Sequence, residues 1–278
     1  MISNLRPLLF KAGSFAVLAA MFGSGIASGR PLIPGQNNEH LTPVQRELER
    51  QRRRLKSEDI EERRDALMRL GNLKRPDASR VAAAGLTDVA PIVRVTAAHA
   101  ILSLPPADAA TLLIPLLQDK SEFVRREAAY ALGQTRSRAA VAPLEIVLLN
   151  DKETGVRGAA AVALGEIGDE SAGPALTRVL AGQPGTKKKA KAESNVFVMR
   201  AAARSLGQIK SRAGVDVLIA ALANEANDND VRREAATALG LIGDTAAGPA
   251  LQAAFASIDP YLSEAAHAAL RRLKSTKN

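Results

Sequence analysis

A ten-residue motif that returns at nearly constant intervals constrains this chain more than any other feature. Residues 124–133 (VRREAAYALG) align with residues 156–165 (VRGAAAVALG) and residues 231–240 (VRREAATALG). With the weaker copies included, the motif starts at positions 62, 93, 124, 156, 198, 231 and 262, so that successive copies are 31 to 33 residues apart with one longer step of 42. A period of this length indicates a repeat protein in which each copy is one structural unit.

Each copy predicts a first helix. Val124, Ala128, Ala131 and Leu132 are three or four positions apart, which gives a helix one apolar stripe. We expect Gly133 to end this helix, because the residue just past a helix end often needs a positive φ that glycine adopts easily. The same interpretation applies to Gly165, Gly207 and Gly240.

A shorter second helix is predicted after each glycine, as in residues 142–149 and 172–180. A single helix pair cannot bury its apolar stripe, so the units must stack on one another. Aromatic residues make up only 3% of the chain, which suits closely packed helices. We therefore predict an all-α fold, an α-solenoid of about seven helical hairpins over residues 57–274, with a basic loop insertion at residues 181–195 and a tail at residues 275–278.

The first thirty residues carry the pattern of an export signal. Arg6 and Lys11 precede an uncharged stretch whose apolar core spans residues 15–22. A basic start, a short apolar core and small residues before a cleavage point are typical of a secretory signal peptide. We predict a signal peptide over residues 1–27, cleaved near Ala27, and a periplasmic or secreted chain with no transmembrane span once mature. The sequence leaves open an uncleaved N-terminal membrane anchor.

Between this segment and the repeats, the sequence predicts a tether and one extra helix. Residues 28–41 are rich in Pro, Gly and Asn and lack periodicity, as flexible linkers do. Thr42 and Gln45 have the spacing of a capping box, with Pro43 at the first helical position. We therefore expect a charged helix over residues 42–56.

The copy that begins at Asp151 is similar to a known repeat. The residues that match the HEAT-like repeats of the phycobilin lyase type are Asp151, Val156, Arg157, Ala160, Ala161, Ala163, Leu164, Gly165, Ile167, Gly168 and Asp169. The chain resembles these repeats over about residues 57–274. The resemblance implies the solenoid fold, and it implies no activity, because the matching residues are those of the scaffold and such repeats serve many roles.

The residues that an enzyme of this fold would need are missing. A di-iron hydroxylase that acts on deoxyhypusine is built from similar repeats, and its metal ligands are repeated His-Glu pairs. His40, His99 and His267 are far apart in the sequence, and none forms such a pair. The chain has no Cys, which excludes thiolate chemistry and Cys-ligated zinc. We predict no enzymatic activity and no cofactor; the disfavoured alternative is a phycobilin lyase-like or deoxyhypusine hydroxylase-like enzyme.

Charged residues recur at two fixed places in the repeat. The basic place, just after the start of the motif, holds Arg94, Arg125, Arg157 and Arg232. The acidic place, five residues before the motif, holds Asp88, Asp119, Asp151 and Glu193. Aligned arginines could bind a phosphate polymer, but we favour an internal ladder of Asp and Arg that ties neighbouring repeats together.

The chain has a formal charge of +9, and two of its basic clusters are only partly offset by neighbouring acids. Their members are Arg52, Arg53 and Arg54 before the repeats and Lys187, Lys188, Lys189 and Lys191 in the insertion. These clusters could dock onto anionic lipid or an envelope polymer. Neither contains an aromatic side chain on which bases could stack, so nucleic acid is not an expected partner.

The leading hypothesis is an extracytoplasmic scaffold or adaptor that binds a protein or peptide. Its binding surface would be the concave face of the solenoid, which the second helices are expected to line. The polar residues predicted on that face are Thr111, Gln118, Glu145, Thr177, Arg178, Asp216 and Gln252.

Overall fold

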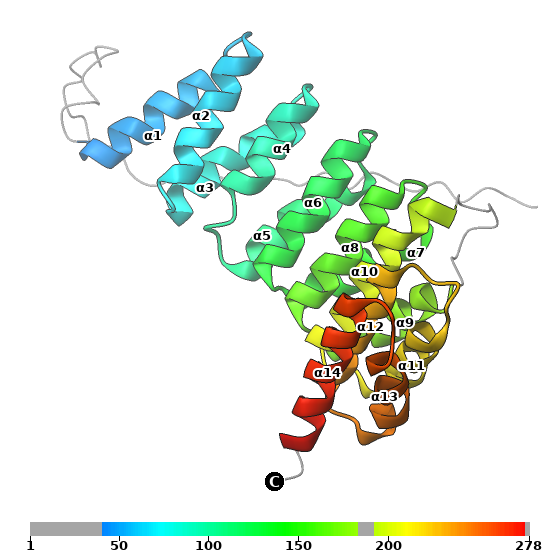
Figure 1. Ribbon diagram of the computed structural model, residues 1–278. Coiled ribbons are helices and arrows are strands. Elements are labelled where there is room, and N and C mark those ends of the chain that lie inside the picture. The colour runs from blue at the N-terminus through cyan, green and yellow to red at the C-terminus, as the bar shows by residue number, and fades with distance from the viewer. Residues whose placement is uncertain (1–40, 183–191, 276–278) are drawn as a thin grey trace, which may run out of the picture. The chain divides into compact units, whose positions relative to one another are not determined.

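Helices provide all the regular structure of the computed structural model, which describes residues 41–182 and 192–275. From Thr42 onward the chain forms one compact unit, in which longer and shorter helices alternate along the sequence (Figure 1). No β-strand occurs in the described residues. The predicted all-α solenoid is confirmed.

The helices fall into two sets. The first helices of the repeats are α2 (Ile60–Asn72), α4 (Pro91–Ala100), α6 (Glu122–Thr135), α8 (Thr154–Ile167), α10 (Ala192–Gln208), α12 (Asn229–Ile242) and α14 (Pro260–Ser275). The second helices are α3 (Pro76–Ala82), α5 (Pro106–Leu113), α7 (Val141–Asn150), α9 (Gly173–Leu180), α11 (Val215–Ala223) and α13 (Gly248–Phe255). Two 3-10 turns, η2 (Ala83–Thr87) and η3 (Ile114–Gln118), extend α3 and α5. Four more precede the later second helices: η4 (Arg138–Ala140), η5 (Glu170–Ala172), η6 (Arg212–Gly214) and η7 (Thr245–Ala247).

The seven copies of the motif do not give seven hairpins. The described residues form six helix pairs, which we number units 1 (α2 and α3) to 6 (α12 and α13), and the seventh copy supplies α14 without a second helix. The 14 α-helices of the described residues agree with the prediction of about seven hairpins, although α1 and α14 stand outside the six pairs. The motif marks only first helices, so it cannot tell whether a second helix follows.

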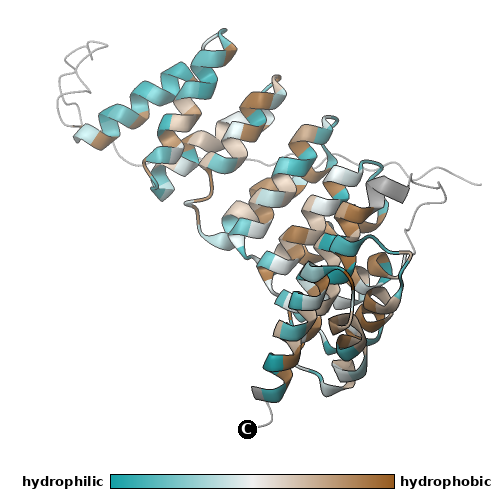
Figure 2. Ribbon diagram, in the orientation of Figure 1, coloured by the Kyte–Doolittle hydropathy of each residue, from teal (hydrophilic) through white to brown (hydrophobic). Residues whose placement is uncertain are grey.

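One extra helix, α1 (Pro43–Arg54), precedes unit 1 and packs on α2 and α3. The Thr42 hydroxyl accepts a hydrogen bond from the Gln45 amide at 3.3 Å, and Gln45 Oε1 accepts one from the Thr42 amide at 2.8 Å. Both bonds of the expected capping box are therefore present. Figure 2 shows that α1 is hydrophilic over most of its surface, and its buried residues are Leu48 and Gln51.

The stacked units share one apolar core. Its largest fully buried side chains are Leu67, Leu70, Ile101, Leu113, Leu132, Leu144, Leu148, Leu164, Leu176, Leu206, Leu218 and Leu222. These residues come from first and second helices of successive units and belong to a single cluster. Burial of each unit therefore depends on its neighbours, as expected for a solenoid.

The motif glycines do not end their helices, contrary to prediction. Gly133 and Gly240 lie inside α6 and α12, and a Cβ added at Gly240 would lie 2.7 Å from the Cα of Ala269 on α14. The positive φ values come three residues after the motif, at Arg136 (53°), Gly168 (76°), Lys210 (52°) and Gly243 (79°). Glycine is needed here because neighbouring first helices approach closely, and not because of its backbone freedom.

Some sequence predictions fall on residues that the structure does not describe. These are the signal peptide at 1–27, nearly all of the linker at 28–41 and the lysines of the insertion. Within residues 41–182 and 192–275, no helix is long and apolar enough to cross a membrane.

Candidate functional site

Three buried ion pairs join successive units along one edge of the stack. Arg63 Nε, Arg94 Nε and Arg125 Nε each lie 2.7 Å from a carboxylate oxygen of the next unit, those of Asp88, Asp119 and Asp151. We call each pair a rung. In each rung a second guanidinium nitrogen binds the other carboxylate oxygen, so the contact is bidentate. Arg94 and Arg125 also donate to the backbone carbonyls of Asp88 and Asp119, so each of these arginines joins two consecutive acidic loops.

The rungs also set the pKa of their carboxyl groups. Burial alone would raise the pKa of Asp88 and of Asp119. The hydrogen bonds from Arg63 and Arg94, together with backbone amides, outweigh burial and lower both pKa values below the usual range for Asp. Both carboxyl groups are therefore ionised in the folded chain at neutral pH.

The predicted ladder does not continue through Arg232, and its step at Arg157 is not tested. Arg157 donates to the carbonyl of Asp151 at 3.1 Å, and among the described residues its buried Nη2 has no hydrogen-bond partner. Arg232 Nε donates to the carbonyl of Leu222 at 3.0 Å, because Ser257 stands where the next acid would be. The side chain of Glu193, the acid in register with Arg157, is outside the described residues.

The last units are joined by a different set of ion pairs, which the sequence did not reveal. Arg200 lies 2.9 Å from Asp230, Arg204 lies 2.6 Å from Glu234, and Arg233 lies 2.7 Å from Asp259. Arg204 is 59% exposed, whereas Arg94 in its rung is 7% exposed. Arg63 was also missed, because the first copy of the motif begins with Glu62 in place of an apolar residue.

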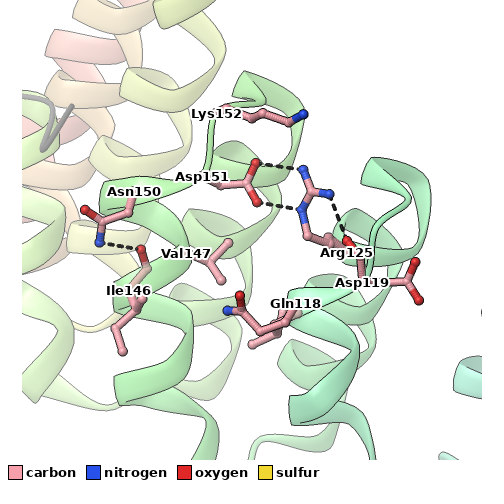
Figure 3. Close-up of a pocket in the computed structure, with 9 residues that line it drawn as sticks. Gln118, Asp119, Arg125, Ile146, Val147, Asn150, Asp151 and Lys152 are labelled. Carbon is pink, nitrogen blue, oxygen red and sulfur yellow. Dashed lines mark hydrogen bonds and ion pairs between the residues drawn. The ribbon is translucent and has the colours of Figure 1, made fainter. Parts of the chain in front are cut away.

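A groove of about 420 Å³, which we call groove 1, lies beside the third rung. It runs between the end of unit 2 and α7, and Figure 3 shows Arg125 in its wall, held by Asp151 and by the backbone of Asp119. Its apolar lining includes Ile146, which is 58% exposed. Its polar lining includes Gln118, Asn150 and Lys152.

A second groove of about 440 Å³, groove 2, lies two units further along, between the end of α9 and α11. Its lining residues are repeat equivalents of those in groove 1: Ala220 for Ile146, Ala221 for Val147, Asn224 for Asn150 and Met199 for Arg125. Two different units therefore have a groove at the same position of the repeat. Groove 1 has a charged wall, whereas the described lining of groove 2 is uncharged.

Of the seven predicted docking residues, Gln118 lines a groove. Thr111, Arg178, Asp216 and Gln252 are exposed on second helices but line neither groove. Glu145 and Thr177 are half-buried at equivalent positions of α7 and α9. The prediction named only polar residues and so overlooked the apolar Ile146, whose exposure depends on the rotation of α7 and cannot be read from the sequence.

The two half-buried residues are polar groups in partly apolar surroundings. Burial raises the pKa of the Glu145 carboxyl, and the nearby carboxylate of Asp169 raises it further. Thr177 Oγ1 is buried and has no hydrogen-bond partner. Both groups therefore reduce the stability of the fold.

The basic cluster before the repeats is largely neutralised by neighbouring acids. Arg52 pairs with Glu49, and Arg54 pairs with Glu62 at 3.3 Å and with Asp65 at 2.6 Å. Lys187, Lys188, Lys189 and Lys191 lie outside the described residues. In the described part of the chain, no group of three or more His, Cys, Asp or Glu side chains is arranged to hold a metal ion.

Comparison with solved structures finds matches at low sequence identity. Human deoxyhypusine hydroxylase in complex with glycerol is 22% identical, covers 83% of this chain and 96% of its own, and has a TM-score of 0.41. The complex of CpcE and CpcF of phycocyanin lyase from Nostoc sp. PCC7120 is 24% identical, covers 90% and 94%, and has a TM-score of 0.48. An engineered protein is 22% identical, covers 82% and 68%, and has a TM-score of 0.48.

No curated protein matches the chain. A family model described as HEAT repeats matches residues 52–130, 79–153, 110–196 and 188–271. These overlapping matches extend from the end of α1 into α14 and include all six units. The chain therefore belongs to the HEAT-repeat family.

Proposed function

We propose that this chain is a non-catalytic scaffold that binds a protein or peptide along its second helices. The observation that supports this proposal is the recurrence of grooves 1 and 2 at the same place in the repeat. A partner segment that follows the row of second helices meets the same shape twice. Two weak contacts on one partner segment bind more tightly than either contact alone.

The lining of the grooves suits a polypeptide ligand. Ile146 offers an exposed apolar surface, and apolar anchors surrounded by polar groups are typical of binding sites. Asn150 Nδ2 donates to the carbonyl of Ile146 at 2.9 Å, so its Oδ1 retains acceptor capacity for a backbone N–H of a partner. Asn224 repeats this amide in groove 2.

The proposal is tested by blocking both grooves in the full chain. Ile146→Arg and Ala220→Arg place a long charged side chain in each groove, and both positions are exposed, so the fold should be kept. The matched control is Thr237→Arg, at an exposed position on the first helix α12. Partners are captured by crosslinking in the exported fraction and quantified by mass spectrometry.

We expect a partner that is recovered with the native chain and the Thr237→Arg control and is reduced at least tenfold with the double groove variant. Equal recovery with the groove variant would contradict the proposal. Loss of the partner on deleting Lys187–Lys191, with the groove variant unaffected, would assign binding to the basic insertion. Binding through basic residues should also weaken steeply with added salt.

We also propose that the chain acts outside the cytoplasm, on the basis of the basic and apolar pattern of residues 1–27. Expression of the full chain and N-terminal sequencing of the product tests this. A mature protein that begins at Ser28 in the exported fraction would support it. An intact N-terminus in the soluble cytosolic fraction would contradict it.

A further inference from the structure

The two ends of the stack are built differently. At the N-terminal end, α1 packs on α2 and α3 in the way that α7, α9 and α11 pack on the two helices of the next unit. At the C-terminal end, α14 is a first helix that no second helix follows within the described residues. Within the described residues, no helix lies at the place beside α13 that a seventh second helix would fill.

The consequence is visible at Phe255, the last residue of α13. Its equivalents in units 1 to 5 are covered by the following unit and are at most 8% exposed: Leu86, Leu117, Leu148, Leu180 and Leu222. Phe255 is 47% exposed, although its ring stacks on His267 of α14 at 5.2 Å. Ile258, three residues later, is fully exposed. An aromatic ring thus stands at a position that is buried in the other units, and about half of it is exposed to solvent.

The outer face of α14 lacks the small and apolar residues on which a further first helix would pack. His267 stands where the preceding first helices have the buried residues Leu67, Ala98, Ala129, Ala161, Ala203 and Ala236. Arg271 stands at the place of the close-packing glycines such as Gly240. Both substitutions are polar and exposed, as terminal repeats require.

A second copy of this chain is a poor occupant of the place beside α13. The exposed side chains of α1 that would meet it include Arg46, Arg50 and Arg53. The C-terminal end itself presents the exposed cations Arg271 and Lys274. Like charges would therefore face each other across such a contact.

We propose that the place beside α13 receives an amphipathic helix of another protein, whose apolar stripe covers Phe255 and Ile258 and whose polar side carries acidic residues toward Arg271 and Lys274. The helix continues the row in which α13 already packs beside α11. This surface is separate from grooves 1 and 2, so it does not depend on the function proposed above.

The test uses two stapled helical peptides as probes of the full chain. Both have the sequence of α7, residues 141–150, which keeps the apolar stripe of Leu144, Val147 and Leu148. In the acidic probe, the exposed positions 142, 146 and 150 are Glu; in the basic probe, they are Lys. Binding is measured by fluorescence anisotropy at low ionic strength.

We expect the acidic probe to bind at least tenfold more tightly than the basic probe. Phe255→Ala and Ile258→Asp should each lower the affinity of the chain for the acidic probe at least fivefold. Because Ile258 is fully exposed, its substitution should leave the fold intact. The groove variant Ile146→Arg should bind the probe as the native chain does. Equal affinity for both probes, no binding of either, or full binding by Ile258→Asp would overturn the proposal. Sedimentation that shows a dimer lost in Ile258→Asp would assign the surface to a second copy and overturn it as well.

Discussion

Units 1 to 4 and units 5 to 7 of the stack are held together by different ion pairs, if α14 is counted as the seventh. In the first region, bidentate rungs such as Arg94–Asp119 are nearly buried, with side chains 7% and 12% exposed. In the second region, pairs such as Arg204–Glu234 lie between first helices, and Arg204 is 59% exposed. Close approach of first helices is common to both regions from unit 3 onward: a Cβ on Gly133 would lie 2.8 Å from backbone and one on Gly240 2.7 Å, whereas the distance for Gly71 in unit 1 is 3.2 Å.

Buried and exposed ion pairs contribute differently to the stability and to the register of the stack. A buried ion pair adds little net stability, because desolvation offsets the attraction, but removing one partner leaves an unpaired buried charge. The rungs therefore fix the register between units more than they add free energy. An exposed pair can be lost with little effect. In the second region, the close packing of first helices, which already begins at Gly133, fixes the register without such rungs.

The largest effect should come from breaking a rung. Arg125→Ala leaves the Asp151 carboxylate without its bidentate partner and should lower the free energy of unfolding by roughly 3 kcal/mol. Arg204→Ala, the matched change in the second region, should cost less than about 1 kcal/mol. Urea unfolding followed by circular dichroism measures both. Equal costs would show that the two kinds of pair do not differ.

Adding a methyl group should destabilise the closely packed first helices more than α2, whose glycine has more room. Gly240→Ala places a Cβ against the backbone of Ala269 and should cost about 2 kcal/mol through overpacking. Gly71→Ala meets Ala100 at 3.2 Å, and the higher helix propensity of Ala should offset most of the strain. Thermal unfolding of the two variants compares them. A larger loss for Gly71→Ala would contradict this account of the second region.

Acid should weaken the first region through its carboxyl groups. The pKa values of Asp88 and Asp119 are lowered in the folded chain, so their contribution to stability is complete above the unfolded-state pKa of about 4. This contribution is lost as the pH falls below that value through the folded-state pKa. Urea midpoints at pH 7 and pH 3 should differ less in an Asp88→Asn, Asp119→Asn variant than in the native chain. An unchanged difference would exclude these two groups as its source.

The smallest effect is expected at Glu145, on α7 of the first region. The raised pKa of this carboxyl means that its charged form reduces stability above the folded-state pKa. Glu145→Gln should therefore raise the free energy of unfolding at pH 7 by less than about 1 kcal/mol, since the side chain is only half-buried. The gain should shrink as the pH is lowered and Glu145 itself becomes neutral. A loss of stability at pH 7 would indicate a hydrogen bond that the carboxylate makes and the amide cannot.

Sequence reasoning worked where a pattern has one physical cause. The period of 31 to 33 residues predicted stacked helix pairs, and the Thr42 and Gln45 spacing predicted the start of α1. It placed Arg94 and Arg125 opposite acids of the next unit, because a residue's place in the repeat determines its neighbour.

Sequence reasoning failed where two physical causes give the same pattern. A glycine near a helix end can supply a positive φ or a close approach, and only coordinates show that Gly240 does the second. The positions of grooves 1 and 2 depend on where helices end and how they rotate, which the apolar stripe does not fix to one residue. Ile146 was therefore not distinguished from core residues of α7, although it is exposed.

A pair of double-mutant cycles tests the difference between the regions most directly. One cycle combines Arg94→Ala with Asp119→Ala, and the other combines Arg204→Ala with Glu234→Ala; each yields the coupling energy between the two side chains. We predict a coupling of about 2 kcal/mol for the buried rung and below about 0.5 kcal/mol for the exposed pair. Couplings of the same size in both cycles would contradict the claim that burial makes the rungs, and not the later pairs, hold neighbouring units in register.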